Sequence, residues 1–306
     1  MVKRIIISIL LILVFGRVFG QHPPIHSLYM FDPILINPAF TGSAVQLSAT
    51  FLHRNQWVNF PGAPSTQSMS LHSGFLQSRV GVGLYMTRDN IGIHSDYSMF
   101  GTYAYKIKSK RGVFSMGLQG GFHHLSSDFN LLNIRNLNDP NLGGVINKLN
   151  PNVGVGFLYS EKKFFAGFSI PYLLENKLYD IESVLSEAKQ SRLYYLHGGI
   201  TLEPNSNLTV KPSVQFRLQH GSPFSFDLNC TFIYKDRIGL GGSYRVYDAM
   251  IFLFELKVLE NFHIGYAYDY TTSEINKFSN GSHEIMLNYR VKLGKLHKGL
   301  QCPSYF

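Results

Sequence analysis

Residues 208–234 read LTVKPSVQFRLQHGSPFSFDLNCTFIY, and this stretch decides the class of fold. From Leu208 to Leu218 apolar residues occupy most even positions, and polar residues occupy the odd ones. The same two-residue period returns from Phe224 to Tyr234 after the turn-forming residues HGSP. Such alternation places apolar and polar side chains on opposite faces of a β-strand. The stretch therefore predicts two neighbouring antiparallel strands, each with one apolar face and one polar face.

The same alternation recurs along most of the chain. Most of the segments that carry it are 8 to 13 residues long, close to the 9–11 residues that a tilted membrane-spanning strand needs. There are fourteen such segments, at 45–57, 66–76, 79–88, 97–108, 113–125, 152–160, 163–170, 193–202, 206–219, 224–234, 237–247, 250–258, 262–271 and 282–293.

The connections between these segments fall into two alternating sets. One set is short: 77–78, 109–112, 161–162, 203–205, 235–236 and 259–261. The other contains the long connections 58–65, 89–96, 126–151, 171–192 and 272–281, with 220–223 and 248–249 as brief members. Outer-membrane barrels have short periplasmic turns, longer outer loops and an even number of strands. The sorting therefore predicts an all-β, up-and-down transmembrane barrel of about fourteen antiparallel strands.

The composition agrees with a membrane barrel. Charged residues make up 15% of the 306 residues and aromatic residues 14%, whereas charged residues in soluble domains approach ~25%. The net charge is +9, but no run of Lys and Arg with interleaved aromatic residues stands out. We therefore expect outer-membrane lipid, and not nucleic acid, around this protein.

The chain divides into a leader, a lead-in, a barrel and a tail. Lys3 and Arg4 precede an apolar run that is typical of a secretory signal. The next residues are rich in proline and precede the first strand, so we expect them at the periplasmic mouth. The predicted parts are a signal peptide at 1–20, the lead-in at 21–44, the barrel at 45–293 and a C-terminal tail at 294–306.

Several glycines fall inside the predicted strands. In a strand, glycine marks curvature or the close approach of other groups, here the contents of the lumen. These glycines are Gly81, Gly83, Gly117, Gly154, Gly156, Gly239, Gly241 and Gly242.

A set of motifs along the chain resembles one known family. The motifs are LYMFDPILINPAFTG, HRNQW, PGAPSTQSMSLH, GVGLYMTRDNIG, YAYKI, PNVGVGFLY, FFAGFSIPYLL, GLGGSYRVYDA and GSHEIMLNYR, in this order. Together they resemble the PorP/SprF family of outer-membrane proteins of the type IX secretion system, over about residues 26 to 293. The resemblance implies an outer-membrane barrel that supports the secretion or surface attachment of cargo, such as gliding adhesins. It also implies contact with periplasmic components of that system.

No arrangement of residues favours an enzyme, a cofactor or a metal. Ser70 and His72 share a strand face but have no acidic neighbour in sequence to orient the imidazole. His123 and His124 are adjacent and therefore point to opposite faces of a strand. The only cysteines, Cys230 and Cys302, leave open one disulfide or two free thiols.

Charged residues within the strands indicate the lumen side. A charge on the lipid face costs roughly 2–4 kcal/mol at the membrane midplane, so these residues should face inward and pair. They form either a structural lattice or a surface that contacts cargo or an internal plug. The candidate lumen charge lattice is Arg54, Arg217, Asp227, Arg245, Asp269, Glu284 and Arg290.

The lead-in has too many apolar residues for a free tail. We expect it to narrow the periplasmic mouth and to offer a face to the secretion machinery. The candidate partner-contact residues are Tyr29, Met30, Phe31, Asp32, Asn37, Pro38 and Phe40. The alternative function is a passive porin-like channel for small solutes, which needs an open lumen.

The loop sorting predicts the orientation in the membrane. Accessible tags at Asn138 and Glu182 should be labelled on intact cells, because these residues lie in long outer loops. Tags at Lys110 and Asn205 should be labelled only after the outer membrane is opened. The reverse pattern would invert the topology.

Overall fold

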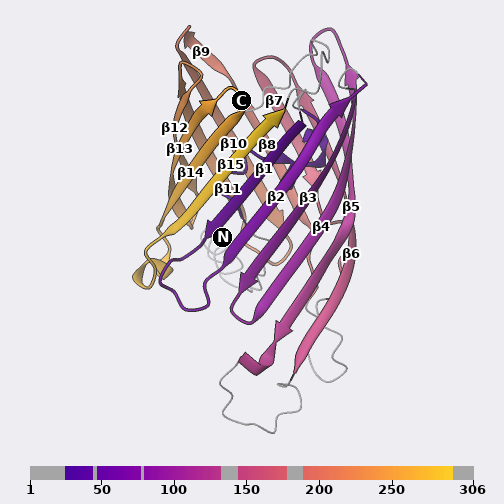
Figure 1. The fold of residues 1–306 in the computed structure, drawn as a ribbon, viewed down its shortest axis with the longest axis vertical. Coiled ribbons are helices and arrows are strands. Elements are labelled where there is room, and N and C mark those ends of the chain that lie inside the picture. Colours follow the sequence, from indigo (N-terminus) through magenta and orange to yellow (C-terminus); the bar gives the residue numbers. More distant parts are fainter. Residues whose placement is uncertain (1–24, 44–46, 77–78, 132–143, 178–188, 292–306) are drawn as a thin grey trace, which may run out of the picture.

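The strands form one antiparallel sheet that closes on itself (Figure 1). The computed structural model describes residues 25–43, 47–76, 79–131, 144–177 and 189–291. Its strands are β1 (Leu47–Asn55), β2 (Ser65–Phe75), β3 (Val80–Ile91), β4 (His94–Lys108), β5 (Val113–Asp128), β6 (Val145–Ser160), β7 (Phe164–Ile170), β8 (Leu193–Ile200), β9 (Leu202–Asn205), β10 (Leu208–Gln219), β11 (Ser225–Tyr234), β12 (Ile238–Arg245), β13 (Ala249–Leu259), β14 (Phe262–Thr271) and β15 (Ser282–Val291).

Closure comes from the pairing of the last strand with the first, with Met286 opposite Leu52. β8 and β9 are separated by Thr201 alone, and both pair with β10. They therefore act as one strand of the barrel. The described residues thus form fourteen antiparallel barrel strands, which confirms the predicted fold class.

The break between β8 and β9 was not expected from the sequence. Val210 pairs with Leu202 of β9 and Ser213 pairs with Gly199 of β8, and the ladder on this side of β10 is interrupted between these two pairs. Pro212 lies in this gap and has no N–H to donate to a ladder. We attribute the break to this proline.

The alternation in the sequence marks the two faces of the wall. On β11, Leu228 and Phe232 are exposed to 50% and 49%, whereas Asp227 and Thr231 are exposed to 0% and 1%. On this strand most apolar side chains therefore face outward, and most polar side chains face the lumen. This is the arrangement of a membrane barrel and the inverse of a soluble protein.

The connections define two ends of the barrel. At the short-turn end they are 76–79, 109–112, 161–163, 206–207, 235–237 and 260–261; at the long-loop end they are 56–64, 92–93, 129–144, 171–192, 220–224, 246–248 and 272–281. One expected long loop, 89–96, is instead a tight turn, because β3 and β4 stay paired up to Ile91 and His94. The β5–β6 hairpin also stays paired beyond its expected end and projects from the long-loop end (Figure 1).

No helix in the described residues is long and apolar enough to cross a membrane. The helical pieces are single 3-10 turns: η1 (Pro33–Leu35), η2 (Pro38–Phe40), η3 (Phe129–Leu131) and η4 (Glu274–Lys277). The expected signal peptide, the tail and Cys302 lie outside the described residues. Cys230 is partly exposed.

The lead-in lies inside the barrel, and we use the name for its described residues 25–43. Its start is hydrogen-bonded to Glu284, near the long-loop end of β15. Its last turn approaches Gly81, near the short-turn end of β3. The segment was expected at the periplasmic mouth, whereas the structure places it along the lumen from one end to the other.

A charge introduced on the outward face of β11 and β12 tests whether this face meets lipid. Leu228→Lys and Leu240→Lys place an ammonium group in hydrocarbon, which costs about 2–4 kcal/mol at the midplane. We expect a clear loss of folded barrel in the outer membrane, measured as the heat-modifiable band on a gel. Leu228→Phe is the matched control and should assemble normally. Equal assembly of Leu228→Lys would mean that this face does not meet lipid.

Candidate functional site

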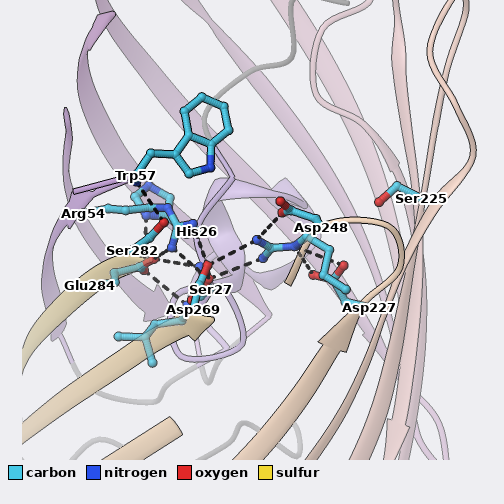
Figure 2. A network of polar contacts seen from close by, with 12 residues as sticks. His26, Ser27, Arg54, Trp57, Ser225, Asp227, Asp248, Asp269, Ser282 and Glu284 are labelled. Atoms are coloured by element: carbon cyan, nitrogen blue, oxygen red, sulfur yellow. Dashed lines mark hydrogen bonds and ion pairs between the residues drawn. The ribbon is translucent and has the colours of Figure 1, made fainter. Parts of the chain in front are cut away.

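A buried group of arginines and carboxylates lies near the long-loop end (Figure 2). Arg54 on β1 forms ion pairs with Asp269 on β14 at 2.6 Å and with Glu284 on β15 at 3.1 Å. All three side chains are at most 2% exposed. Because these charges are removed from water, they depend on one another for stabilisation.

The group continues across the lumen to β10, β11 and β12. Asp227 accepts a hydrogen bond from Arg217 at 2.7 Å and forms an ion pair with Arg245 at 3.2 Å. Arg245 also lies 3.5 Å from Asp269, which joins the two halves. We call these six residues (Arg54, Arg217, Asp227, Arg245, Asp269 and Glu284) the arginine–carboxylate network.

The network binds the start of the lead-in. Glu284 accepts the backbone N–H groups of Ser27 at 2.7 Å and of Leu28 at 3.2 Å. The Ser27 hydroxyl donates to Asp269 at 2.8 Å and accepts from Arg54 at 2.9 Å. Hydrogen bonds to charged groups are the strong ones, so this contact fixes the position of Ser27 (Figure 2).

Of the seven residues of the predicted lattice, the structure brings six together and leaves out Arg290. Arg290 lies near the short-turn end of β15, where its Nε donates to Asn288 at 2.9 Å. It lies six positions along the strand from Glu284, which corresponds to ~20 Å. The sequence indicated that Arg290 faces the lumen like the other six residues, but it did not indicate how far along the barrel axis Arg290 lies.

The next part of the lead-in packs on an apolar region of the lumen wall. Leu28, Met30 and Phe31 are between 0% and 7% exposed. Their cluster includes residues of β1, β8, β13, β14 and β15, namely Leu52, Leu193, Tyr195, Ala249, Ile251, Leu253, Ala267 and Met286. Each large side chain buried in this way stabilises the packed state by ~1.5–3 kcal/mol.

All seven predicted partner-contact residues are buried in this packing. The side chains of these seven residues are all buried: Tyr29, Met30, Phe31, Asp32, Asn37, Pro38 and Phe40. The Tyr29 hydroxyl accepts a hydrogen bond from Asn229 on β11 at 2.6 Å. In this conformation these residues contact the barrel wall and present no surface to another protein.

Glycines of the wall make room for the last part of the lead-in. A Cβ atom added at Gly117 on β5 would lie 2.2 Å from the backbone nitrogen of Ala39. One added at Gly156 on β6 would lie 2.0 Å from Oδ1 of Asn37. The sequence allowed curvature or close approach at these positions, and the structure shows close approach.

Asn37 also fixes the turn that follows. Its Oδ1 accepts from the backbone N–H of Ala39 at 2.9 Å, which caps η2. Its Nδ2 donates to the carbonyl oxygen of Phe157 on β6 at 3.1 Å. One side chain therefore holds both the shape of the lead-in and its place on the wall.

Ser70 and His72 serve the same packing. His72 accepts a hydrogen bond from the Gly42 N–H at 3.2 Å, and Lys106 donates to the Gly42 carbonyl oxygen. The Ser70 hydroxyl lies next to Asp32 of the lead-in, a neighbour that sequence separation concealed. His123 faces the lumen and contacts the rings of Phe100 and Tyr172.

The sequence reading missed Ser27 and His26. His26 lies 3.3 Å from Glu284 and 2.9 Å from the Ser68 hydroxyl. Nothing in the local sequence distinguishes these two residues from ordinary loop residues. Their role arises because strands distant in sequence converge on them.

Breaking the network by removing one partner should destabilise the barrel. Arg54→Leu leaves Asp269 and Glu284 buried without their main partner, which costs about 3–5 kcal/mol. We expect a lower temperature of conversion from the folded to the unfolded band on a gel. Arg192→Leu is the control, because Arg192 forms an exposed pair with Glu175 at 3.7 Å, and such pairs contribute little. An unchanged conversion temperature for Arg54→Leu would contradict the assigned role.

Comparison with solved structures finds other barrels. The CymD monoaromatic hydrocarbon channel is similar, with a TM-score of 0.53 at 12% identity, over 92% of this chain and 98% of that one. The NanC porin has a TM-score of 0.43 at 11% identity, over 81% of this chain and 100% of that one. At these identities the likeness to CymD shows the fold alone. No curated protein matches the chain.

The family comparison is decisive. The family described as type IX secretion system membrane protein PorP/SprF matches residues 18–289, which is most of the chain. The match includes the lead-in and thirteen of the fourteen barrel strands in full, and ends within the last one. It confirms the family that the motifs resembled and the localisation in the outer membrane. The chain therefore belongs to the PorP/SprF family of type IX secretion system membrane proteins.

Proposed function

We propose that this outer-membrane component of the type IX secretion system supports the secretion or surface attachment of cargo proteins, such as gliding adhesins, as a plugged barrel. In this proposal it contacts cargo and periplasmic machinery with its ends and does not conduct small solutes. The observation that carries the proposal is the lead-in that occupies the lumen.

Inside the barrel, the lead-in contacts strands on every side of the lumen. Ser27 contacts β14 and β15, Tyr29 contacts β11, Asn37 contacts β6, and Gly42 contacts β2. A segment that binds strands around the whole circumference crosses the lumen. A porin-like channel, in contrast, needs a water-filled lumen.

Displacement of the lead-in is costly. Six large apolar side chains of the segment are nearly inaccessible to solvent: Leu28, Met30, Phe31, Ile34, Ile36 and Phe40. At ~1.5–3 kcal/mol each, their exposure costs on the order of 10 kcal/mol, and the apolar wall behind them would be exposed as well. The plugged state therefore dominates in the absence of a partner.

Contacts with other proteins then fall to the two ends. The candidate partner-contact residues are buried, so cargo and machinery meet the barrel through its loops and turns. By the usual orientation of such barrels, the long-loop end faces the exterior and the short-turn end faces the periplasm.

Secretion and conductance together test the proposal. A strain without this protein should lose surface or secreted type IX cargo, measured by immunoblotting of cells and medium, and the wild-type chain should restore it. In planar bilayers the purified wild type should show little conductance. Normal cargo levels in the strain without the protein would refute the secretion role, and steady porin-like conductance of the wild type would favour the passive channel.

Two glycines of β5 provide a matched pair of variants. Gly117→Val should force the lead-in away from the wall and raise the conductance, because its Cβ would lie 2.2 Å from Ala39. Gly120→Val on the same strand meets nothing within 4 Å and should behave like the wild type. Equal conductance of the two variants would mean that the lead-in does not close the lumen.

A further inference from the structure

The short-turn end carries an uneven distribution of charge. Three consecutive turns, β2–β3, β4–β5 and β6–β7, bring together six basic residues and one acidic residue, Glu161. We call the six basic residues the basic rim: Arg79, Lys108, Lys110, Arg111, Lys162 and Lys163. The turns are neighbours because strands β2 to β7 are neighbours in the sheet.

Most charges of the basic rim are exposed and unneutralised. Arg79, Lys110, Arg111, Lys162 and Lys163 are exposed, and none of them forms a salt bridge with another residue that the structure describes. The one carboxylate of the region, Glu161, accepts a hydrogen bond from the Tyr159 hydroxyl at 2.7 Å. The rim is therefore a concentrated positive surface.

The opposite side of the same end is balanced. From β9 to the β13–β14 turn, the charged residues near this end are four basic ones, Lys211, Lys235, Arg237 and Lys257, and four acidic ones, Glu203, Asp236, Glu255 and Glu260. Lys257 pairs with Asp236 and with Glu260, both at 3.1 Å. Among the turns that the structure describes at this end, the excess of positive charge therefore lies on one arc.

We propose that the basic rim is the docking surface for an acidic face of a periplasmic protein. This inference rests on the proposed function and adds the chemistry and the place of the contact. Lipid headgroups surround a barrel on all sides, so binding to them would call for basic residues around the full circumference. A one-sided arc matches a single protein partner.

The size of the arc fits a protein interface. Strands β2 to β7 are separated by five strand spacings, or about 24 Å at ~4.8 Å each. A standard interface covers ~800 Å² on each partner, which corresponds to a patch about 28 Å wide. Exposed rim charges act mainly on the association rate and on its dependence on salt.

The end of the lead-in reaches the wall below this arc. Gly42 lies against Gly81 of β3 and is bound by Lys106 of β4, two strands that carry the rim. A protein docked on the basic rim therefore sits over the point where the lead-in joins the wall.

Photo-crosslinking in living cells tests the surface. The full-length protein would carry p-benzoylphenylalanine at Lys110 or at Lys162, with Lys235 on the balanced side as the control position. We expect a protein adduct at the first two positions and none at Lys235. No protein adduct at Lys110 or Lys162, an equal adduct at Lys235, or adducts with lipid alone would each overturn the proposal.

Charge reversal provides the second measurement. With the crosslinker at Lys162, the combined substitution Lys110→Glu, Arg111→Glu and Lys163→Glu should lower the adduct about tenfold or more. Lys235→Glu with Arg237→Glu should leave it unchanged, and both variants should keep the heat-modifiable band. An adduct that survives the first reversal would refute electrostatic docking.

The two proposals can fail separately. If removal of the whole protein leaves secretion intact, the proposed function fails, whatever the crosslinks show. If removal abolishes secretion but reversal of the basic rim changes neither the adduct nor the secretion, the docking surface alone is refuted.

Discussion

Hydrocarbon offers no partner to a backbone N–H or C=O group, and the rest of this structure depends on that constraint. A sheet meets it by closing, and here β15 closes onto β1 with a continuous register from Leu47 to Asn55. Closure creates an interior that must be filled by water or by protein. In this chain protein fills it, since the lead-in crosses the lumen from end to end.

The lead-in and the wall are matched by two kinds of contact. At the long-loop end, charge holds the segment, because Glu284 and Asp269 receive their hydrogen bonds partly from Ser27. Further along, apolar packing and close approach hold it, and Gly117 and Gly156 lack the Cβ atoms that would block it. The network alone would fix the position of the lead-in but stabilise it little. The apolar packing alone would stabilise the lead-in without fixing its position along the lumen.

A plugged barrel changes which surfaces can act. Residues that were expected to contact a partner, such as Tyr29 and Phe40, are buried and instead pack against the barrel wall. In the proposed function, the contacts with cargo and machinery therefore fall at the two ends. There the structure shows a difference in charge between one side of the short-turn end and the other, which the apolar belt of the wall cannot provide.

The sequence by itself determined the barrel, its strands and its family. Period-two alternation is local, so stretches such as 224–234 could be assigned without knowledge of their neighbours. The inward face of Arg54, Asp227 and Glu284 followed from the same rule. The break between β8 and β9 did not follow from this rule, because it depends on which strand pairs with Pro212.

Tertiary structure decided everything that depends on register and on height in the barrel. It separated Arg290 from six other charges of the same expected lattice, and it brought Ser27 to Arg54. It also placed the lead-in in the lumen, where the sequence had suggested the periplasmic mouth. It brought three basic turns side by side. The fold brings together residues more than two hundred positions apart, such as Ser27 of the lead-in and Glu284 of β15, and no local pattern encodes that contact.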